Sequence, residues 1–137
     1  VHDYVRWPIK WSNYIKSVQA YKELQKRFPT LRLNCWTTVS SLNVGNLPNI
    51  LDFTTEHNLD HNWAFLNNPD VLNPKYKNKF TLMAKERLEK STYDVCRNIA
   101  GKIACDVDND KLHDLFTKRQ DRLRNINVKD YFNFFPK

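Results

Sequence analysis

The sequence predicts an α/β fold with parallel strands, because two short apolar runs flank a short helical segment between residues 31 and 69. Residues 31–39 alternate in character with the two-residue period of a strand. A helix signal over residues 46–57 follows, with Asn46 as its N-cap and Pro48 in its first turn. A second apolar run at 61–66 then ends at Asn67-Asn68-Pro69. Strand, helix and strand in this order form the unit of a parallel sheet with right-handed crossovers.

The first predicted strand has an apolar face and a polar face. If the leucine-bearing face met solvent instead, Arg32 would be buried without a partner, so we expect helices to cover the leucine face. The polar face then lines a barrel interior or a cleft. The apolar face comprises Leu31, Leu33, Cys35, Thr37 and Val39, and the polar face Arg32, Asn34, Trp36, Thr38 and Ser40.

A long amphipathic helix is predicted before this strand, starting at Pro8 or Ser12 and ending at Pro29. Its apolar residues recur every three or four positions. We expect the part from Trp11 to Tyr21 to pack on the same side of the sheet as the helix of residues 46–57. The whole stripe consists of Trp7, Trp11, Tyr14, Val18, Tyr21, Leu24 and Phe28.

Three further helices are predicted after the second strand. One reaches Lys90, the next follows a capping-box pattern at Ser91 and Asp94, and the third is capped by Asp106 or Asp108. A last aromatic element spans residues 128–135. Because no repeat or linker interrupts the chain, residues 1–137 form a single domain with a helical C-terminal tail. The third helix carries Leu112, Leu115, Phe116 and Leu123.

Several chemistries are excluded by the residues present. With two glycines in the chain, no phosphate-binding loop or dinucleotide fingerprint is available. The acidic run that starts at Asp106 resembles a calcium loop, but Lys111 stands where that loop needs glycine. His57 and His61 have the spacing of metal ligands on one helix, yet Asn58 is predicted to end the helix between them. We therefore expect no metal site.

Charge and cysteine content indicate the setting of the protein. No run of 18 apolar residues and no charged-then-apolar leader is present, so we expect a cytoplasmic chain without a membrane span. Cys35, Cys96 and Cys105 are an odd, widely spaced set, which favours reduced thiols. The net charge of +7 allows a polyanion partner such as nucleic acid, although mixed signs along the helices favour solvated faces.

Three stretches of the chain resemble a known enzyme family. Read in order they are HDYVRWPIKWSNYIKSVQAYKEL, LRLNCWTTVSSLNVGNLPNILDFTTEHNL and NWAFLNNPDVLNP. Together they resemble the C-terminal half of a radical S-adenosylmethionine (SAM) enzyme core of the twitch type found in phages and bacteria. The closing KRQDRLRNINVKDYF is similar to the Asp–Arg-containing tail of such proteins. The matching residues are Asp3 and Arg6, Thr38-Val39 with Asn43, and the segment 62–66.

The resemblance implies a fold and a set of site residues. The fold is a fragment, half of a TIM-type barrel, with parallel strands and a helical C-terminal tail. Arg6, Thr38, Asn43 and Leu66 are implied to bind SAM, and Asn34, Trp36 and Asn62 to face the substrate. For Arg6 the reason is a bidentate pair between guanidinium and carboxylate.

Ordinary structural roles remain open for the same residues. Arg6 is equally read as a surface residue at a helix start, Thr38 as a β-branched strand residue, and Trp36 as the filling of the half-barrel. For Asn43 we favour side-chain hydrogen bonds that hold the turn after the strand over contact with a ligand.

The chain departs from the family in one large respect. The CxxxCxxC loop that binds a [4Fe–4S] cluster has no counterpart, and Cys35, Cys96 and Cys105 do not replace it. The resemblance therefore implies part of an enzyme of 5′-deoxyadenosyl radical chemistry, with SAM and a cluster in the complete protein and no activity in this chain alone. The missing N-terminal half of the barrel would be its partner. The alternative is a basic, aromatic-rich module that binds nucleic acid or a protein.

Overall fold

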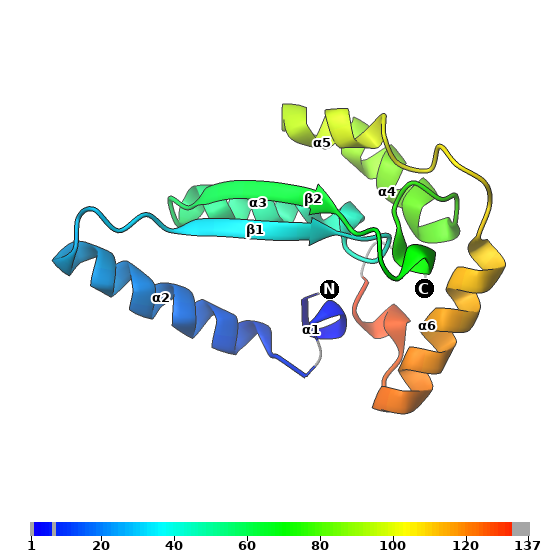
Figure 1. Ribbon diagram of the computed structural model, residues 1–137, viewed down its shortest axis with the longest axis horizontal. Helices are drawn as coiled ribbons and strands as arrows, with labels where there is room; N and C mark the ends of the chain where they lie inside the picture. Colours follow the sequence, from blue (N-terminus) through cyan, green and yellow to red (C-terminus); the bar gives the residue numbers. More distant parts are fainter. Residues whose placement is uncertain (1, 7, 133–137) are drawn as a thin grey trace.

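A computed structural model describes residues 2–6 and 8–132 as a mixed α/β structure that is mostly helical (Figure 1). Trp7 and the predicted element beyond residue 132 lie outside the described residues. No described helix combines the length and the apolar character needed to cross a membrane. The elements are α1 (His2–Val5), α2 (Trp11–Arg27), β1 (Asn34–Val39), α3 (Leu47–Glu56), β2 (Asp60–Phe65), α4 (Lys79–Glu89), α5 (Asp94–Ala100) and α6 (Asp110–Arg124), with 3₁₀ turns at Val44–Asn46, Asp70–Leu72 and Val128–Asp130.

The predicted strand–helix–strand unit is confirmed. β1 and β2 pair in parallel, in a register that runs from Asn34 opposite Asp60 to Val39 opposite Phe65. α3 connects them and lies behind both strands in the view of Figure 1. Asn58 has a left-handed backbone at φ 48°, which lets the chain turn from α3 into β2 as the sequence predicts.

The two faces of β1 differ in burial as the alternation predicts for part of the run, but the expectation is wrong for Ser40 of the polar face, which is buried directly after the strand. Asn34 and Trp36 are exposed, whereas Thr37 and Val39 are 7% and 0% exposed. Burial of the leucine face is complete only at the C-terminal end of the strand, because Leu31, Leu33 and Cys35 are half-buried. Trp36 is 61% exposed, so it does not fill an interior in this chain.

The main core lies between the sheet, α3 and the α4–α5 pair. Val39 and Leu47 meet Leu88, Cys96 and Ile99 there, and all five are fully or almost fully buried. A second, smaller core joins the N-terminal helix to the C-terminal segment and contains Tyr4, Leu42, Phe80 and Phe132.

α2 contacts α3 at one end only. The rings of Trp11 and Tyr14 lie 5.0 and 6.1 Å from the ring of Phe53 in α3, and Val18 is buried. The expectation that Tyr21 packs on the sheet is wrong, because Tyr21 is 55% exposed. The C-terminal part of α2 extends past the start of β1 (Figure 1).

Two of the predicted helix caps are wrong. The N-cap of α5 is Tyr93, and Ser91 lies too early to cap it, since its hydroxyl accepts a hydrogen bond from the Tyr93 N–H. The N-cap of α6 is Asn109, and Asp108 instead accepts a hydrogen bond from the Asp110 N–H.

A capping box that the sequence analysis missed starts α4. The Asn78 side chain accepts from the Thr81 N–H, and the Thr81 hydroxyl accepts from the Asn78 N–H. The sequence contains the pattern of this capping box, an Asn followed three residues later by a Thr. Thr is less usual than Glu or Gln at the second position of a capping box.

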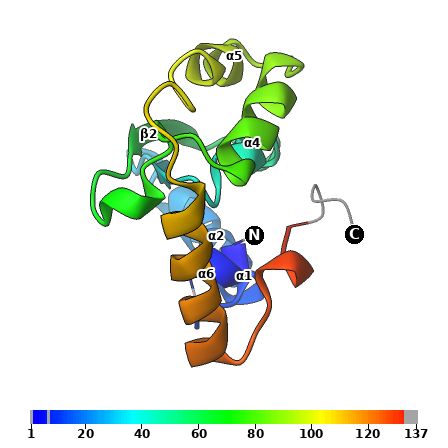
Figure 2. The ribbon, with the colours of Figure 1, turned by 90° about the vertical axis from the view of Figure 1, so that its right-hand side faces the viewer.

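α6 packs with its polar side inward. His113 and Thr117 are buried, and Nε2 of His113 lies 2.8 Å from the hydroxyl of Ser41, which follows β1. Leu112, Leu115 and Leu123 are exposed, so the leucines that predicted this helix do not enter the core. Figure 2 shows α6 along the side of the molecule nearest the viewer.

Candidate functional site

Two adjoining cavities lie at the C-terminal end of β1. The larger, called the cleft, has a volume of about 730 Å³ and is lined by α1, α2, β1 and the first part of α3. The smaller, called the hollow, has a volume of about 330 Å³ and is lined by the end of β1 and by α6. The two cavities share the residues Val5, Arg6, Thr38 and Asn43. These residues therefore form the centre of the candidate site.

Arg6 is held at the boundary of the two cavities by the short helix α1. Its own N–H donates to the carbonyl of His2, which closes the helix. The Tyr4 hydroxyl donates to Oδ1 of Asp121 at 2.8 Å, and Nη1 of Arg124 donates to the Tyr4 carbonyl at 2.9 Å. No described carboxylate pairs with the Arg6 guanidinium, which is exposed. Its charge is therefore available to a ligand.

Asn43 shapes the turn that follows β1. Its Oδ1 accepts a hydrogen bond from the Ser40 N–H at 2.7 Å, and its Nδ2 donates to the Thr38 carbonyl at 2.9 Å. Both ends of the amide thus bind backbone, which supports the structural interpretation of this residue. Asn43 therefore holds the backbone of Thr38 and Ser40 at the end of β1.

Aromatic side chains form one wall of the cleft. The rings of Trp11 and Tyr14 are stacked at 5.1 Å with 20° between their planes, and Phe53 meets Trp11 edge-on. Trp36 lines the cleft from the strand. Aromatic faces of this kind bind planar apolar groups such as a nucleobase.

A phenol and a thiol meet on the floor of the cleft. The hydroxyl of Tyr14 lies 3.6 Å from Sγ of Cys35. Burial, and then the contact with Cys35, raise the pKa of Tyr14 to about 12, while the charge of Arg6 opposes the rise. Tyr14 is therefore a neutral phenol at physiological pH, and Arg6 lies close enough to act on it.

Amide side chains line the cleft at the start of α3. Nδ2 of Asn49 donates to Oδ1 of Asn46 at 2.9 Å, and Nη2 of Arg87 donates to Oδ1 of Asn49 at 3.0 Å. Asn46 and Asn49 stand beside the aromatic wall, so a ligand that packs on the rings also meets hydrogen-bonding groups.

The hollow is more basic than the cleft. Arg6 and Arg124 line it, and its described lining contains no Asp or Glu. Ser40 also lines it with a buried hydroxyl that has no hydrogen-bond partner in the described part of the chain. The remaining walls are apolar or amide side chains, among them Leu66, Phe116 and Gln120.

The structure brings together five of the seven residues that the sequence indicated. Arg6, Trp36, Thr38 and Asn43 line the cleft, and Leu66 joins Arg6, Thr38 and Asn43 in the hollow. The described lining of neither cavity includes Asn34 or Asn62.

Sequence reasoning missed contributions from three distant segments. Tyr14 and Trp11 come from α2, where their spacing indicated a core stripe, Asn49 comes from α3, and Asn46 is the residue just before α3. Gln120 and Arg124 reach the hollow from α6. Gln120 and Arg124 are visible in the sequence near the end of this helix. Nothing in the sequence indicates that α6 lies beside the end of β1.

Comparisons of the chain with family models, with curated proteins and with solved structures give no match. The chemistry of the cleft and the hollow is therefore the guide to the function of the chain.

Proposed function

We propose that this chain is the SAM- and substrate-facing C-terminal part of a radical SAM enzyme core of the twitch type. One observation carries the proposal. The four residues assigned to SAM all line one hollow, although they follow α1, lie near the end of β1, lie in the turn after β1 and follow β2. The resemblance assigns these residues. The parallel pairing of β1 with β2 and the turn after β1 bring Thr38, Asn43 and Leu66 together, and Arg6 joins them from the chain that follows α1. Arg6, Thr38, Asn43 and Leu66 form this set.

The chemistry of the two cavities fits SAM. The Arg6 guanidinium suits the carboxylate of the methionine portion, since the two groups form a bidentate ion pair. The Thr38 hydroxyl adds a donor and acceptor beside it, and the aromatic wall of the cleft suits an adenine ring. In the complete enzyme SAM supplies the organic radical, and the residues of this chain bind and orient it and exclude water.

The described part of this chain does not fit a [4Fe–4S] cluster. Cys35 lies on β1, Cys96 is fully buried in α5, and Cys105 is exposed in the segment before α6. A cluster needs converging thiolates, and no group of three His, Cys, Asp or Glu is placed to hold a metal among the described residues. In our proposal the cluster is therefore held by a segment outside this sequence.

The open edge of β1 supports a partner of this kind. Among the described residues β1 pairs with β2 alone, so its other edge presents backbone N–H and C=O groups to the cleft. Exposed strand edges are templates for the addition of a further strand. A parallel strand on this edge would extend the sheet toward a half-barrel and would shield Trp36.

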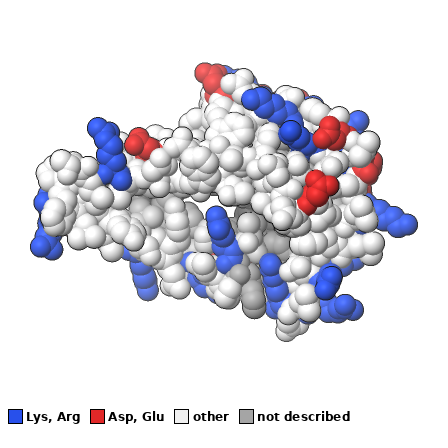
Figure 3. All heavy atoms as spheres, in the orientation of Figure 1, with Lys and Arg blue, Asp and Glu red and all other residues white. Residues whose placement is uncertain are grey.

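A second candidate function is a module that binds nucleic acid. In the lower part of the face shown in Figure 3, the charged side chains that can be seen are Lys and Arg. Exposed aromatic rings accompany them, among them Phe28 and Trp36. Basic grooves with exposed aromatic rings bind single-stranded nucleic acids through phosphate contacts and stacking.

The test is a titration of SAM and of S-adenosylhomocysteine into the chain, followed by protein NMR shifts, which register weak binding. We expect shifts confined to the cleft and the hollow, and about tenfold weaker binding by Arg6→Lys, which loses the bidentate geometry. Thr38→Val should also weaken binding, with little change in melting temperature.

Arg32→Lys is the matched control, because Arg32 is exposed beside the same strand and lines neither cavity. Equal binding by Arg6→Lys and Arg32→Lys would reject the assigned role of Arg6. Shifts produced by a single-stranded oligonucleotide at these residues, without shifts from SAM, would favour the nucleic-acid module instead.

A further inference from the structure

The outward face of α6 carries an apolar ridge that nothing in the described structure covers. Leu112, Leu115 and Leu123 are 63%, 58% and 66% exposed. Their spacings of three and eleven residues place them along one side of a helix. They are called the leucine ridge. Singly exposed leucines are ordinary, but three aligned on one helix form a surface for a partner.

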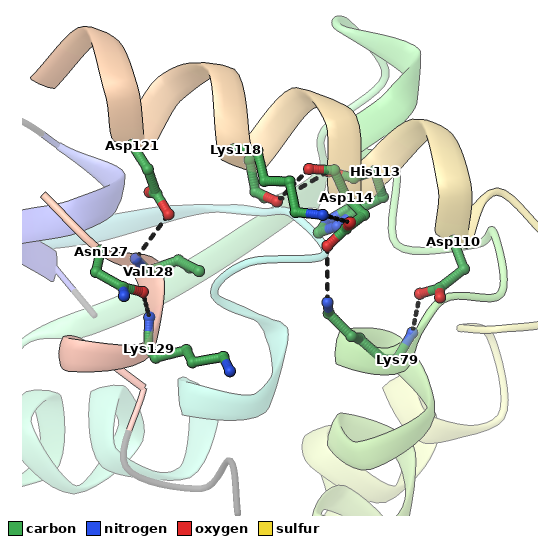
Figure 4. A network of polar contacts seen from close by, with 10 residues as sticks. Lys79, Asp110, His113, Asp114, Lys118, Asp121, Asn127, Val128 and Lys129 are labelled. Atoms are coloured by element: carbon green, nitrogen blue, oxygen red, sulfur yellow. Dashed lines mark hydrogen bonds and ion pairs between the residues drawn. The ribbon is translucent and has the colours of Figure 1, made fainter. Parts of the chain in front are cut away.

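The acidic residues of α6 all bond inward or along the helix. Asp110 accepts a hydrogen bond from the Lys79 N–H, and Asp114 pairs with Nζ of Lys79 and of Lys118. Asp121 accepts from the Tyr4 hydroxyl and the Val128 N–H. Figure 4 shows these carboxylates turned toward α4 and the C-terminal segment. Among the described basic residues beside the leucine ridge, Lys118 alone forms an ion pair with one of these carboxylates.

Basic side chains accompany the leucine ridge. Lys111, Arg119 and Arg122 are exposed and form no ion pair with any carboxylate in the described part of the chain. The fourth cation, Lys118, shares the carboxylate of Asp114. At the helical repeat of 100° per residue, Arg119 falls between the leucines and Arg122 and Lys111 fall on one flank. The face is therefore both apolar and positively charged.

α6 is held rigidly behind this face. His113 and Thr117 are buried, His113 hydrogen-bonds with Ser41 in the segment that follows β1, and Asp121 ties the last turns to α1. The leucine ridge is thus formed before any partner arrives, and docking requires no ordering of the backbone of α6.

We propose that the leucine ridge is a docking surface for an acidic amphipathic helix, whose apolar stripe packs along the three leucines and whose Asp or Glu residues meet Lys111, Arg119 and Arg122. The proposal is independent of the function assigned to the cleft. The positive charge beside the leucines favours an acidic helix as the partner. A second copy of α6 would bring like charges together, and a nucleic acid would leave the leucines without contacts.

The test measures binding of a fluorescein-labelled peptide by anisotropy. The probe is a helix of ~18 residues, long enough to form when bound, with leucine at helical spacing flanked by glutamate. A second peptide carries lysine in place of every glutamate. We expect the glutamate peptide to bind at micromolar concentration and to weaken as salt rises, and the lysine peptide not to bind.

Variants of the chain show where the glutamate peptide binds. Leu115→Gln should weaken the glutamate peptide by at least about tenfold, and Arg119→Glu by about fivefold. Leu82→Gln is the matched control, because Leu82 is a 51% exposed leucine on α4, away from the ridge. Unchanged urea midpoints would show that the variants stay folded.

Equal weakening by Leu82→Gln, or equal binding of the lysine peptide, would overturn the proposal. So would binding of phosphatidylserine vesicles or of a duplex RNA that depends on Leu115 when the glutamate peptide does not bind. SAM titration of Leu115→Gln should match the parent chain, so a failure of the docking surface is separable from a failure of the cleft.

Discussion

The hydroxyl of Tyr4 donates a 2.8 Å hydrogen bond to Asp121, a residue 117 positions later in the chain. Asp121 accepts a second bond from the Val128 N–H at 3.0 Å, so one carboxylate joins α1, α6 and the C-terminal segment. Tyr4 is 1% exposed and sits against the ring of Phe132. Because α1 ends at Val5 and Arg6 follows directly, this bond helps to place the central cation of the candidate site.

Tyr4→Phe should destabilise the protein by about 1.5–3 kcal/mol, since it removes a hydrogen bond to a charged group and leaves part of a carboxylate without a partner. Urea unfolding measures the change. Tyr21→Phe removes the same hydroxyl from a 55% exposed ring and should change stability little. If both variants unfold at the same urea concentration, the Tyr4–Asp121 bond does not stabilise the fold.

Stability should decrease as the pH falls from 6.5 to about 4, because of His113. Burial lowers the pKa of His113 to about 4, Asp110 and Asp114 oppose this, and Lys79 adds to it. The folded pKa lies below the unfolded value of 6.5, so the unfolded chain takes up the proton first. The contribution of His113 to the free energy of unfolding is fully present above pH 6.5, and about 3 kcal/mol of it is lost by pH 4.

Urea midpoints at several pH values between 7 and 4 measure this loss, and His113→Gln should flatten most of it. Burial also lowers the pKa of His61, which adds a smaller loss in the same direction. Asp114 acts at lower pH, because hydrogen bonds from Lys118 and Lys79 lower its pKa to about 2. An unaltered pH dependence in His113→Gln would show that His113 is not the titrating group.

Asn43→Ala should destabilise the protein by about 1–2 kcal/mol, because it removes two hydrogen bonds that close the turn after β1. Asn43→Asp keeps the acceptor for the Ser40 N–H and loses the donor to Thr38, so it should recover part of the loss. Thermal unfolding compares the two. Equal melting temperatures for Asn43→Asp and Asn43→Ala would mean that the Ser40 contact contributes nothing.

The chain alone should not assemble an iron–sulfur cluster. Anaerobic reconstitution with iron and sulfide should leave no stable absorbance in the region of about 400 nm, because Cys35, Cys96 and Cys105 do not converge in space. Cys105→Ser should give the same spectrum as the parent chain. Stoichiometric iron that is retained after gel filtration would contradict this prediction.

The central unit of the fold could be predicted because its signals are local. The two-residue alternation of residues 31–39 defines both the strand and its faces, and the left-handed cap at Asn58 ends α3 as expected. The contact of α2 with α3 through Trp11 and Tyr14 was also predictable. The exposure of Tyr21 could not be predicted in this way, because a periodic apolar stripe on a helix does not show where the surface that packs against it ends.

Part of the lining of the candidate site was named from the sequence, Thr38 from its place at a strand end and the other residues from the resemblance. Arg6, Thr38, Asn43 and Leu66 stand at the ends of elements in or beside the strand–helix–strand unit, where parallel-sheet proteins place ligand contacts, and the structure gathers them in one hollow. Tyr14 and Asn49 also line the cleft, and Arg124 also lines the hollow. Their positions depend on how α2 and α6 close on β1, which no local pattern encodes.

The orientation of α6 shows most clearly what only the tertiary structure decided. Its leucines predict a helix, and by themselves they predict that the leucines enter the core. Instead His113 and Thr117 are buried. Nε2 of His113 shares a hydrogen bond with the hydroxyl of Ser41, which follows β1, while the Thr117 hydroxyl donates to the His113 carbonyl within α6 itself. Hydrophobic periodicity in the sequence thus determined that α6 forms, whereas its inward side depends on a polar partner, Ser41, that a distant segment supplies.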